Sequence, residues 1–323
     1  MEVVFIIGNG FDINLGMKTR YSDFLTYYQS VKSSSEAVNN LKKEISKDFY
    51  NWSDLELALG RYTEKNQTFA EFEEAFEDIG EELAKYLQKE EDDFDFDRVD
   101  KQKLFNYLAN PVILLPPEEK RELDIFKSNK VHSNIHVNII TFNYTQSLEH
   151  IIKKEQEILI IGKIMQYFII LESIEHIHGY VDKRMIMGVN DTTQVSNSLF
   201  HKNQNFLEAF VKEHCNQANK YQVDTLCSAK ISKANLICIF GSSLGDTDNM
   251  WWELIGDKIR EHNCYLIIFY KTDDIPDRIA HKKEKFRREV KELFLNKLIY
   301  QGFERKSIEE KIFVGVNTGI FDF

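Results

Sequence analysis

The sequence predicts an α/β protein with a Rossmann-like, mostly parallel sheet and a large helical insertion after the first strand. Two patterns carry this prediction. Short apolar runs recur, each followed by a polar or glycine-containing turn and then a helix-like stretch, and a long segment between the first two runs shows only helical periodicity. The chain has 323 residues, 43% of them hydrophobic and 13% aromatic, which suffices for a large core.

The strands are expected at four apolar runs, residues 3–7, 137–141, 236–240 and 265–269. The first run is continuous and ends at Gly8, as is typical of a strand buried on both faces of a parallel sheet. Because helix-like patterns follow these runs, the order is that of repeated βα units.

The helical insertion is expected over residues 30–130, which leaves residues 1–29 and 131–323 for the Rossmann-like domain. Its clearest helix is residues 69–87, where Phe72, Ile79 and Leu83 repeat at helical spacing and glutamates occupy the opposite face.

The net charge of −11 comes from one segment. Residues 71–100 contain fourteen acidic and three basic residues, so the rest of the chain is neutral overall. A basic run at residues 278–297 is interpreted as a solvated amphipathic helix, with phosphate contact left as the alternative. We therefore do not expect a nucleic-acid partner.

The cysteines indicate a reducing compartment, because Cys215, Cys227, Cys238 and Cys264 form no C-x-x-C pair. The first residues lack the basic start of a secretion signal, and the apolar stretch at residues 158–171 is too short and too polar for a membrane span. We expect a cytoplasmic protein without a membrane contact. The cysteine spacing also predicts that no metal is bound.

The first motif follows the first predicted strand and consists of Gly8, Asn9, Gly10, Phe11 and Asp12, with Gly16 closing the turn. Glycines there allow a phosphate to approach the backbone at a helix N-terminus. The motif departs from G-x-G-x-x-G because Ile13 occupies the third glycine position. A tight turn without a ligand is the alternative.

Two further motifs contain polar residues. Thr141 and Asn143 follow the second predicted strand, at the sheet edge where open α/β sheets bind ligands, although an asparagine there also caps helices. His176 and His178 lie in a turn after an apolar stretch, and a general base is a better interpretation than a zinc ligand.

The fourth motif, at residues 240–246, contains Gly241, Ser242, Ser243 and Asp246. Small and hydroxyl residues at a helix start suit a phosphate or ribose, and helix capping is the alternative. Residues 241–245 also fit G-x-S-x-G. A hydrolase with Ser243 as nucleophile, Asp273 or Asp274 as orienting acid and His281 as base is therefore kept as an alternative.

Taken in order, the four motifs resemble the signature of the SIR2 (sirtuin) superfamily, G-A-G-x-S-x-x-x-G, T-Q-N-x-D, L-H-G and G-T-S-L. The segments GNGFDINLGMKTRYSDF, WSDLE, TFNYT, HIHG and GSSLGDTD look like the AbiH family of bacteriophage abortive-infection proteins. Asp12, Phe142 and Thr145 depart from the sirtuin pattern, and the paired C-x-x-C zinc ribbon of deacylases is missing.

The resemblance implies an antiphage effector that cleaves NAD⁺ to nicotinamide and ADP-ribose, with NAD⁺ as its substrate. It implies that Asn143 holds water or ribose hydroxyls and that His178 is the base. Glycines 8 and 10 with Asp12 would line the pyrophosphate and nicotinamide side, and Ser242 and Ser243 the ribose and phosphates. Tyr21 and Glu56 are further candidates for the pocket, with core packing and a surface salt bridge as their alternatives.

The competing function is a non-enzymatic nucleotide-binding sensor of infection, and a nuclease or other hydrolase in the same cleft is a third. A phage-derived trigger, a partner protein and a homo-oligomer all stay open from the sequence.

Overall fold

The computed structural model describes residues 1–153, 158–261, 263–272 and 280–323. Within these residues a seven-stranded sheet has the order β3-β4-β2-β1-β5-β6-β7, and every neighbouring pair is parallel except β3 with β4. The strands are β1 (Glu2–Ile7), β2 (Ile135–Thr141), β3 (Leu159–Ile164), β4 (Tyr167–His176), β5 (Leu236–Phe240), β6 (Tyr265–Tyr270) and β7 (Ile312–Val316). The predicted fold class is confirmed.

Between β1 and β2 the chain forms only helices. These are α1 (Gly10–Leu15), α2 (Tyr21–Ser30), α3 (Glu36–Lys47), α4 (Leu55–Tyr62), α5 (Phe69–Asp92), α6 (Lys101–Ala109) and α7 (Pro117–Lys130), with short 3-10 turns among them. The later helices are α8 (Ser147–Ile152), α9 (Gln204–Phe210), α10 (Lys212–Ala218), α11 (Val223–Lys233), α12 (Asn249–Arg260), α13 (Ala280–Leu295) and α14 (Gly302–Glu309).

The sheet has a separate core on each face. Along β1, Val3, Phe5 and Ile7 enter one core, whereas Val4 and Ile6 enter the other, as the two-residue period of a strand requires. Helices α6, α7 and α8 contribute to the first core and α11, α12, α13 and α14 to the second. This burial on both faces explains the continuous apolar runs of the central strands.

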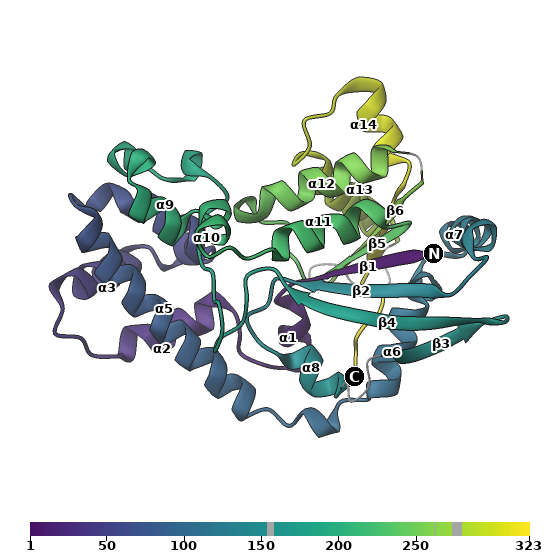
Figure 1. Cartoon of the computed structure of the whole chain (residues 1–323), viewed down its shortest axis with the longest axis horizontal. Helices are drawn as coiled ribbons and strands as arrows, with labels where there is room; N and C mark the ends of the chain where they lie inside the picture. The colour runs from purple at the N-terminus through teal and green to yellow at the C-terminus, as the bar shows by residue number, and fades with distance from the viewer. Residues whose placement is uncertain (154–157, 262, 273–279) are drawn as a thin grey trace.

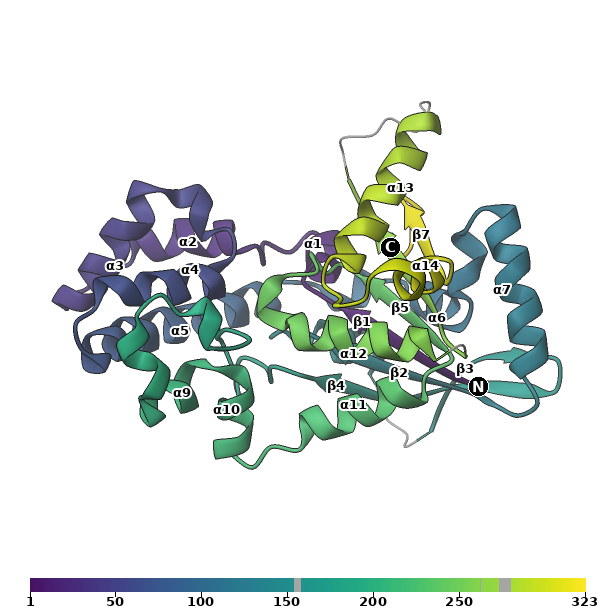
Figure 2. The ribbon, with the colours of Figure 1, turned by 90° about the horizontal axis from the view of Figure 1, so that it is seen from above.

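A third core lies beside the sheet in what we call the helical lobe, made of α2 to α5 with α9 and α10. Figures 1 and 2 show this lobe on the left of the sheet. Helix α5 begins with a capping box, in which Thr68 and Glu71 each bind the backbone of the other, and it buries Phe72, Ile79 and Leu83 in the lobe. Helices α6 and α7 instead pack against the sheet. The domain boundaries at residues 30 and 130 stay a prediction.

The strand register brings the candidate motifs to one edge. Ile7 pairs with Thr141 of β2 and with Phe240 of β5, so these three strands end at the same level. The turns that follow them are therefore neighbours, although they are far apart in the sequence.

Candidate functional site

A cleft of about 710 Å³ opens at the carboxyl edge of the sheet. It lies where the chain order reverses, since β2 is on one side of β1 and β5 with β6 is on the other. Open α/β sheets bind ligands at such a switch point. The cleft is lined by Gly8, Asn9, Gly10, Ile13, Asn14, Arg20, Tyr21, Ser22, Ser53, Asp54, Glu56, Phe142, Tyr144, His178, Phe240, Gly241, Ser242, Ser243, Gly245, Thr247, Asp248, Phe269, Tyr270, Lys271 and Thr272.

The glycines of the first and fourth motifs pack against each other in the cleft wall. The Gly8 and Gly10 N–H groups donate to the carbonyl oxygens of Phe240 (2.9 Å) and Gly241 (2.8 Å). A Cβ atom added to Gly10 would lie 2.4 Å from the Gly241 Cα atom. These glycines are therefore required by backbone contact between two turns, and those two N–H groups are already used.

Asn9 lines the cleft, but its side chain joins two parts of the first loop. Its amide nitrogen donates to the Thr19 carbonyl and its amide oxygen accepts from the Thr19 hydroxyl, each at 2.6 Å. Gly16 ends α1 in the left-handed conformation and does not line the cleft. The first loop thus shapes the cleft through local hydrogen bonds.

Phe11 and Asp12 lie in the interior and not in the cleft, which differs from the cofactor-binding positions expected for them. Phe11 packs edge-on against Phe321 at 5.5 Å between ring centroids. Asp12 is fully buried and accepts a hydrogen bond from the Thr145 hydroxyl at 2.5 Å. Burial raises the pKa of Asp12 to about 6, although the Thr145 hydroxyl acts in the opposite direction.

The loop after β2 is ordered by its own polar groups. The Thr141 hydroxyl donates to the Ile7 carbonyl and accepts from the Asn143 N–H, both at 3.1 Å, so Thr141 is buried in a structural contact. Asn143 is also buried and, unlike its neighbours Phe142 and Tyr144, does not line the cleft, which corrects its expected place. Its Oδ1 atom has no hydrogen-bond partner. A buried amide oxygen without a partner is the kind of group that a ligand or water satisfies.

His178 lies in the cleft wall and pairs with a carboxylate. Its Nε2 atom is 2.9 Å from Asp248 Oδ1, and its ring stacks on Phe142 at 5.4 Å between centroids. Its Nδ1 atom is buried and without a partner. His176 points elsewhere, because its two ring nitrogens contact the Asn143 carbonyl and Glu149. Of the two histidines in the motif, only His178 belongs to the cleft.

Four segments meet in an ionic network next to His178. Lys212 Nζ, at the start of α10, lies 2.9 Å from Glu56 Oε2 and 2.8 Å from Asp248 Oδ1. The Tyr144 hydroxyl is 3.0 Å from Glu56 Oε1. Two carboxylates and one ammonium give these three charged side chains a net charge of −1. This end of the cleft therefore favours a cationic group.

The ionisation of the network follows from these contacts. Burial alone would lower the pKa of Lys212, but Asp248 and Glu56 outweigh it and raise that pKa above its ordinary value. Burial alone would raise the pKa of Asp248, but Lys212 and His178 outweigh it and hold that pKa below its usual range. Burial also raises the pKa of Asp54, which caps α4 at the same end of the cleft.

The fourth motif contributes part of what was predicted. Gly241, Ser242 and Ser243 line the cleft, and the Ser242 hydroxyl accepts from the Leu244 N–H at 3.1 Å. Asp246, predicted to bind the cofactor, is exposed and pairs with Lys297 outside the cleft, which corrects its expected place. In the hydrolase alternative His281 is exposed on α13, and Asp273 and Asp274 lie outside the described residues.

The structure adds residues that the sequence did not single out. Asp248 lies two positions after Asp246 at the N-terminal end of α12, where an aspartate normally caps the helix, but its carboxylate binds His178 and Lys212 instead. No motif marks Lys212. Glu56 and Tyr21 do line the cleft, so the pocket position considered for each agrees with the structure.

The described parts of the chain contain no group of three or more His, Cys, Asp or Glu side chains arranged to hold a metal ion. They also contain no helix that is long and apolar enough to cross a bilayer.

Comparison with known protein families identifies the family of this chain. The family described as bacteriophage abortive infection AbiH matches residues 4–270. The chain belongs to the AbiH family. No curated protein gives a significant match.

Membership of the AbiH family implies a role in phage abortive infection. The matched segment runs from β1 through β6 and includes every residue that lines the cleft except Lys271 and Thr272. The cleft is thus almost entirely within the part of the chain that defines the family.

Proposed function

We propose that this AbiH protein is an abortive-infection effector that hydrolyses NAD⁺ to nicotinamide and ADP-ribose. The observation that carries the proposal is the pairing of His178 with Asp248 inside a ligand-sized cleft at the switch point of the sheet. The resemblance of the four sequence motifs to those of SIR2 enzymes motivates the reaction, and a SIR2-like fold is part of the proposal.

The size of the cleft supports a small-molecule ligand, since such sites usually measure about 300–1,000 Å³. The cleft extends from His178 and Tyr144 past the serine turn to Lys271 and Thr272 after β6. We place the nicotinamide riboside half of NAD⁺ beside His178 and the adenosine half toward Lys271. The serines between them then face the phosphates and ribose.

The charge beside His178 supports bond cleavage at a cationic centre. NAD⁺ carries a positive pyridinium, and positive charge moves to the ribose as the glycosidic bond breaks. The network of Glu56, Lys212 and Asp248 has a net charge of −1 and is held rigidly by buried hydrogen bonds. A fixed negative site stabilises that transition state without reorganising.

The proposed reaction balances with water alone. The bond between ribose C1′ and the nicotinamide nitrogen breaks, and its electron pair stays on the nitrogen, so nicotinamide leaves neutral. Water adds to C1′, and His178 accepts the proton that the water loses. Asn143 does not line the cleft in this structure, and its role of holding the water or a ribose hydroxyl through its partner-free Oδ1 atom is part of the proposal. The products are nicotinamide, ADP-ribose and one proton.

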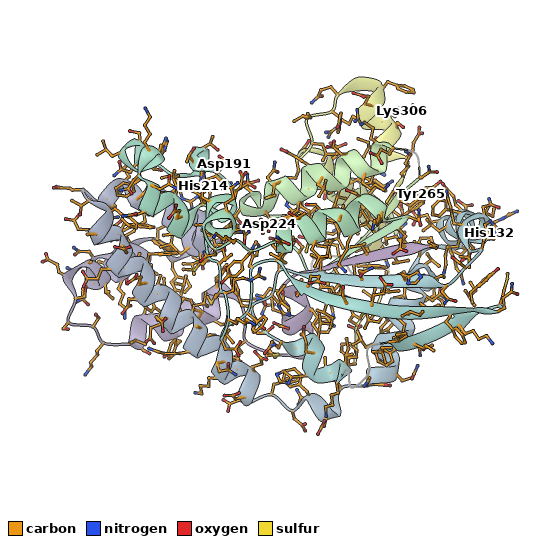
Figure 3. All side chains as sticks on the ribbon, in the orientation of Figure 1. His132, Asp191, His214, Asp224, Tyr265 and Lys306 are labelled. Carbon is orange, nitrogen blue, oxygen red and sulfur yellow. The ribbon has the colours of Figure 1, made fainter. Side chains whose placement is uncertain are left out.

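The first prediction is that purified protein releases nicotinamide from NAD⁺ and that His178→Ala lowers turnover about 10²–10⁴-fold, the usual contribution of a general base. Asn143→Ala is expected to abolish turnover with an unchanged melting temperature. His132→Ala is the matched control, because His132 is exposed at the opposite edge of the sheet, on the right of Figure 3. Its turnover should equal that of the wild type.

The same variants are then tested in infected cells, where the phage supplies any trigger that acts on the effector. NAD⁺ should fall after infection with the wild type and stay constant with His178→Ala. Constant NAD⁺ together with intact phage protection in wild-type cells would overturn the proposal. That outcome would leave the nucleotide sensor or another hydrolase.

A further inference from the structure

Lys212 is a buried cation whose three N–H donors are all used. They lie 2.9 Å from Glu56 Oε2, 2.8 Å from Asp248 Oδ1 and 3.1 Å from the Thr247 carbonyl. The side chain is only 6% exposed. A lysine with this coordination is fixed in position, unlike an ordinary surface lysine.

The hydrogen bond between Asp248 and His178 sets which nitrogen of the imidazole is free. An ionised carboxylate only accepts hydrogen bonds, so Asp248 Oδ1 requires a proton on His178 Nε2. The neutral imidazole then has its lone pair on Nδ1, which has no partner in the protein. The base function of His178 therefore depends on the charge and position of Asp248.

We propose that Lys212 is a positioning residue for His178: it holds Asp248 in place as a carboxylate, and Asp248 keeps the imidazole proton on Nε2 and leaves Nδ1 as the base. This inference deepens the proposed function and rests on it for the identity of the reaction. Lys212 itself touches no reacting atom in this scheme.

The surrounding groups explain why Lys212 is needed. From α4 and its cap, Glu56 and Asp54 face the network, and Tyr21 of α2 and Tyr144 lie against it. On α11, Asp224, which is labelled in Figure 3, adds another carboxyl group near His178, and Arg184 lies on the same side. Lys212 contacts both Glu56 and Asp248 directly. Without it, Asp248 faces the carboxyl groups of Glu56 and Asp54 with no ammonium between them.

The expected consequence of Lys212→Met is a change in protonation. Loss of the ammonium leaves the negative charge around His178 uncompensated, which favours the imidazolium over the neutral base. The acid limb of the kcat/KM profile should therefore move upward by at least about one pH unit, and kcat/KM at a pH on that limb should fall by about tenfold or more. Lys212→Arg restores the charge and should return the acid limb close to that of the wild type.

The matched control is Lys230→Met. Lys230 also contacts three polar groups, Asn138, Ser173 and Glu175, but on α11 against the strands and away from the cleft. A lysine that matters only for stability should behave like Lys230. Both variants can lower the melting temperature, and only Lys212→Met should move the pH profile.

A second measurement separates this inference from the proposed function. The titration of His178 is followed by NMR in isotope-labelled wild type and Lys212→Met, with His178→Asn to assign the signal. The midpoint should rise by at least about one pH unit in Lys212→Met and stay unchanged in Lys230→Met. If Lys212→Met does not fold, Lys212→Gln keeps a polar group at the same place, removes only the charge, and is expected to give the same shift.

An unmoved His178 titration in a folded Lys212 variant would overturn the positioning role, whether or not NAD⁺ is hydrolysed. A shifted titration without nicotinamide release would keep the positioning role and contradict the proposed reaction. The two failures are therefore distinguishable.

Discussion

Asp12 is an unfavourably placed carboxyl group in the protein interior. It is fully buried, its Oδ1 atom has no partner, and only the Thr145 hydroxyl bonds to Oδ2. Burial raises its pKa to about 6 from an ordinary 3.8. A carboxyl group that ionises less easily in the folded than in the unfolded chain destabilises the fold as pH rises through that interval.

We therefore predict that Asp12→Asn stabilises the protein at neutral pH. Below about pH 4 the carboxyl group is protonated in both states and carries no such cost. Between about pH 4 and pH 6 the unfolded chain releases the proton first, so wild-type stability falls by up to roughly 3 kcal/mol and then stays level. Urea unfolding of the two proteins at pH 4 and pH 7.5 measures the difference.

The control for this prediction is Asp191→Asn, at a position labelled in Figure 3. Partial burial of Asp191 works against its charge, but hydrogen bonds from Thr193 and Asn190 outweigh it and hold its pKa below the usual value. Its substitution should cost stability at pH 7.5, the opposite sign. A gain for Asp12→Asn that is equal at both pH values would contradict the role of ionisation.

At the scale of single residues, the sequence identified the motifs but did not always identify the side chain that lies in the cleft. It indicated His178 and the turn at residues 241–246, yet it selected Asp246, which is exposed, and missed Asp248. A one-dimensional pattern gives the turn, whereas the direction of each side chain depends on how the helix begins. Lys212 was missed because its partners Glu56 and Asp248 are far away in the sequence.

Among the elements, the two glycine turns beside the cleft leave no space for a Cβ atom. Gly10 and Gly241 touch through their backbones, and Gly241 also has a φ of 70°. The glycine pattern was interpreted as phosphate approach, but the contact between turns already explains it. Phosphate approach and contact between two turns both require glycine, so the sequence alone does not distinguish between them.

We predict that Gly10→Ala destabilises the protein by at least about 2 kcal/mol, because the new methyl group would overlap Gly241 backbone atoms that have no room to move. The matched control is Gly80→Ala in the middle of α5, where the nearest atom to the new Cβ is Met187 Cε at 3.7 Å. That substitution should stabilise the protein by roughly 0.5–1 kcal/mol through helix propensity. Thermal unfolding of both variants checks the pair, and a Gly10→Ala protein as stable as the wild type would show that the turns do not need close contact.

The elements that the sequence predicted best are those buried on both faces. The four predicted strands correspond to β1, β2, β5 and β6, and the amphipathic α5 was found from its spacing. Strands β3 and β4 were missed because their stretch mixes exposed and buried apolar residues, such as Ile160 and Ile161, without a clear period. Strand β7 is short and close to the C-terminal end of the chain, after a basic helical pattern that dominates the region.

At the scale of the whole molecule, the cleft is built jointly by the sheet turns and the helical lobe. Tyr21 and Glu56 come from lobe helices, whereas His178 and Asp248 follow β4 and β5. Lys212, on α10, bonds to residues of both parts. Tyr21 and Glu56 were pocket candidates from the sequence, but Lys212 and Asp248 were not, because their contacts join segments 36 to 156 residues apart.

The last prediction follows from the fact that the sheet turns and the helical lobe both line the cleft. ADP-ribose bound in the cleft should slow hydrogen exchange in the sheet turns and in the lobe together, because a ligand that fills the cleft stabilises every segment it contacts. At a concentration of about 100 times Kd the stabilisation is roughly 2.7 kcal/mol, enough to slow exchange by about 100-fold in segments that open only when the ligand leaves.

Exchange followed by mass spectrometry should show protection at residues 8–14 and 241–248 and also at residues 20–22 and 53–56. The loop around Leu199, which is exposed and outside the cleft, serves as the internal control. Protection confined to the sheet turns would mean that the lobe does not contact the ligand, and the roles assigned to Glu56 and Tyr21 would then be wrong.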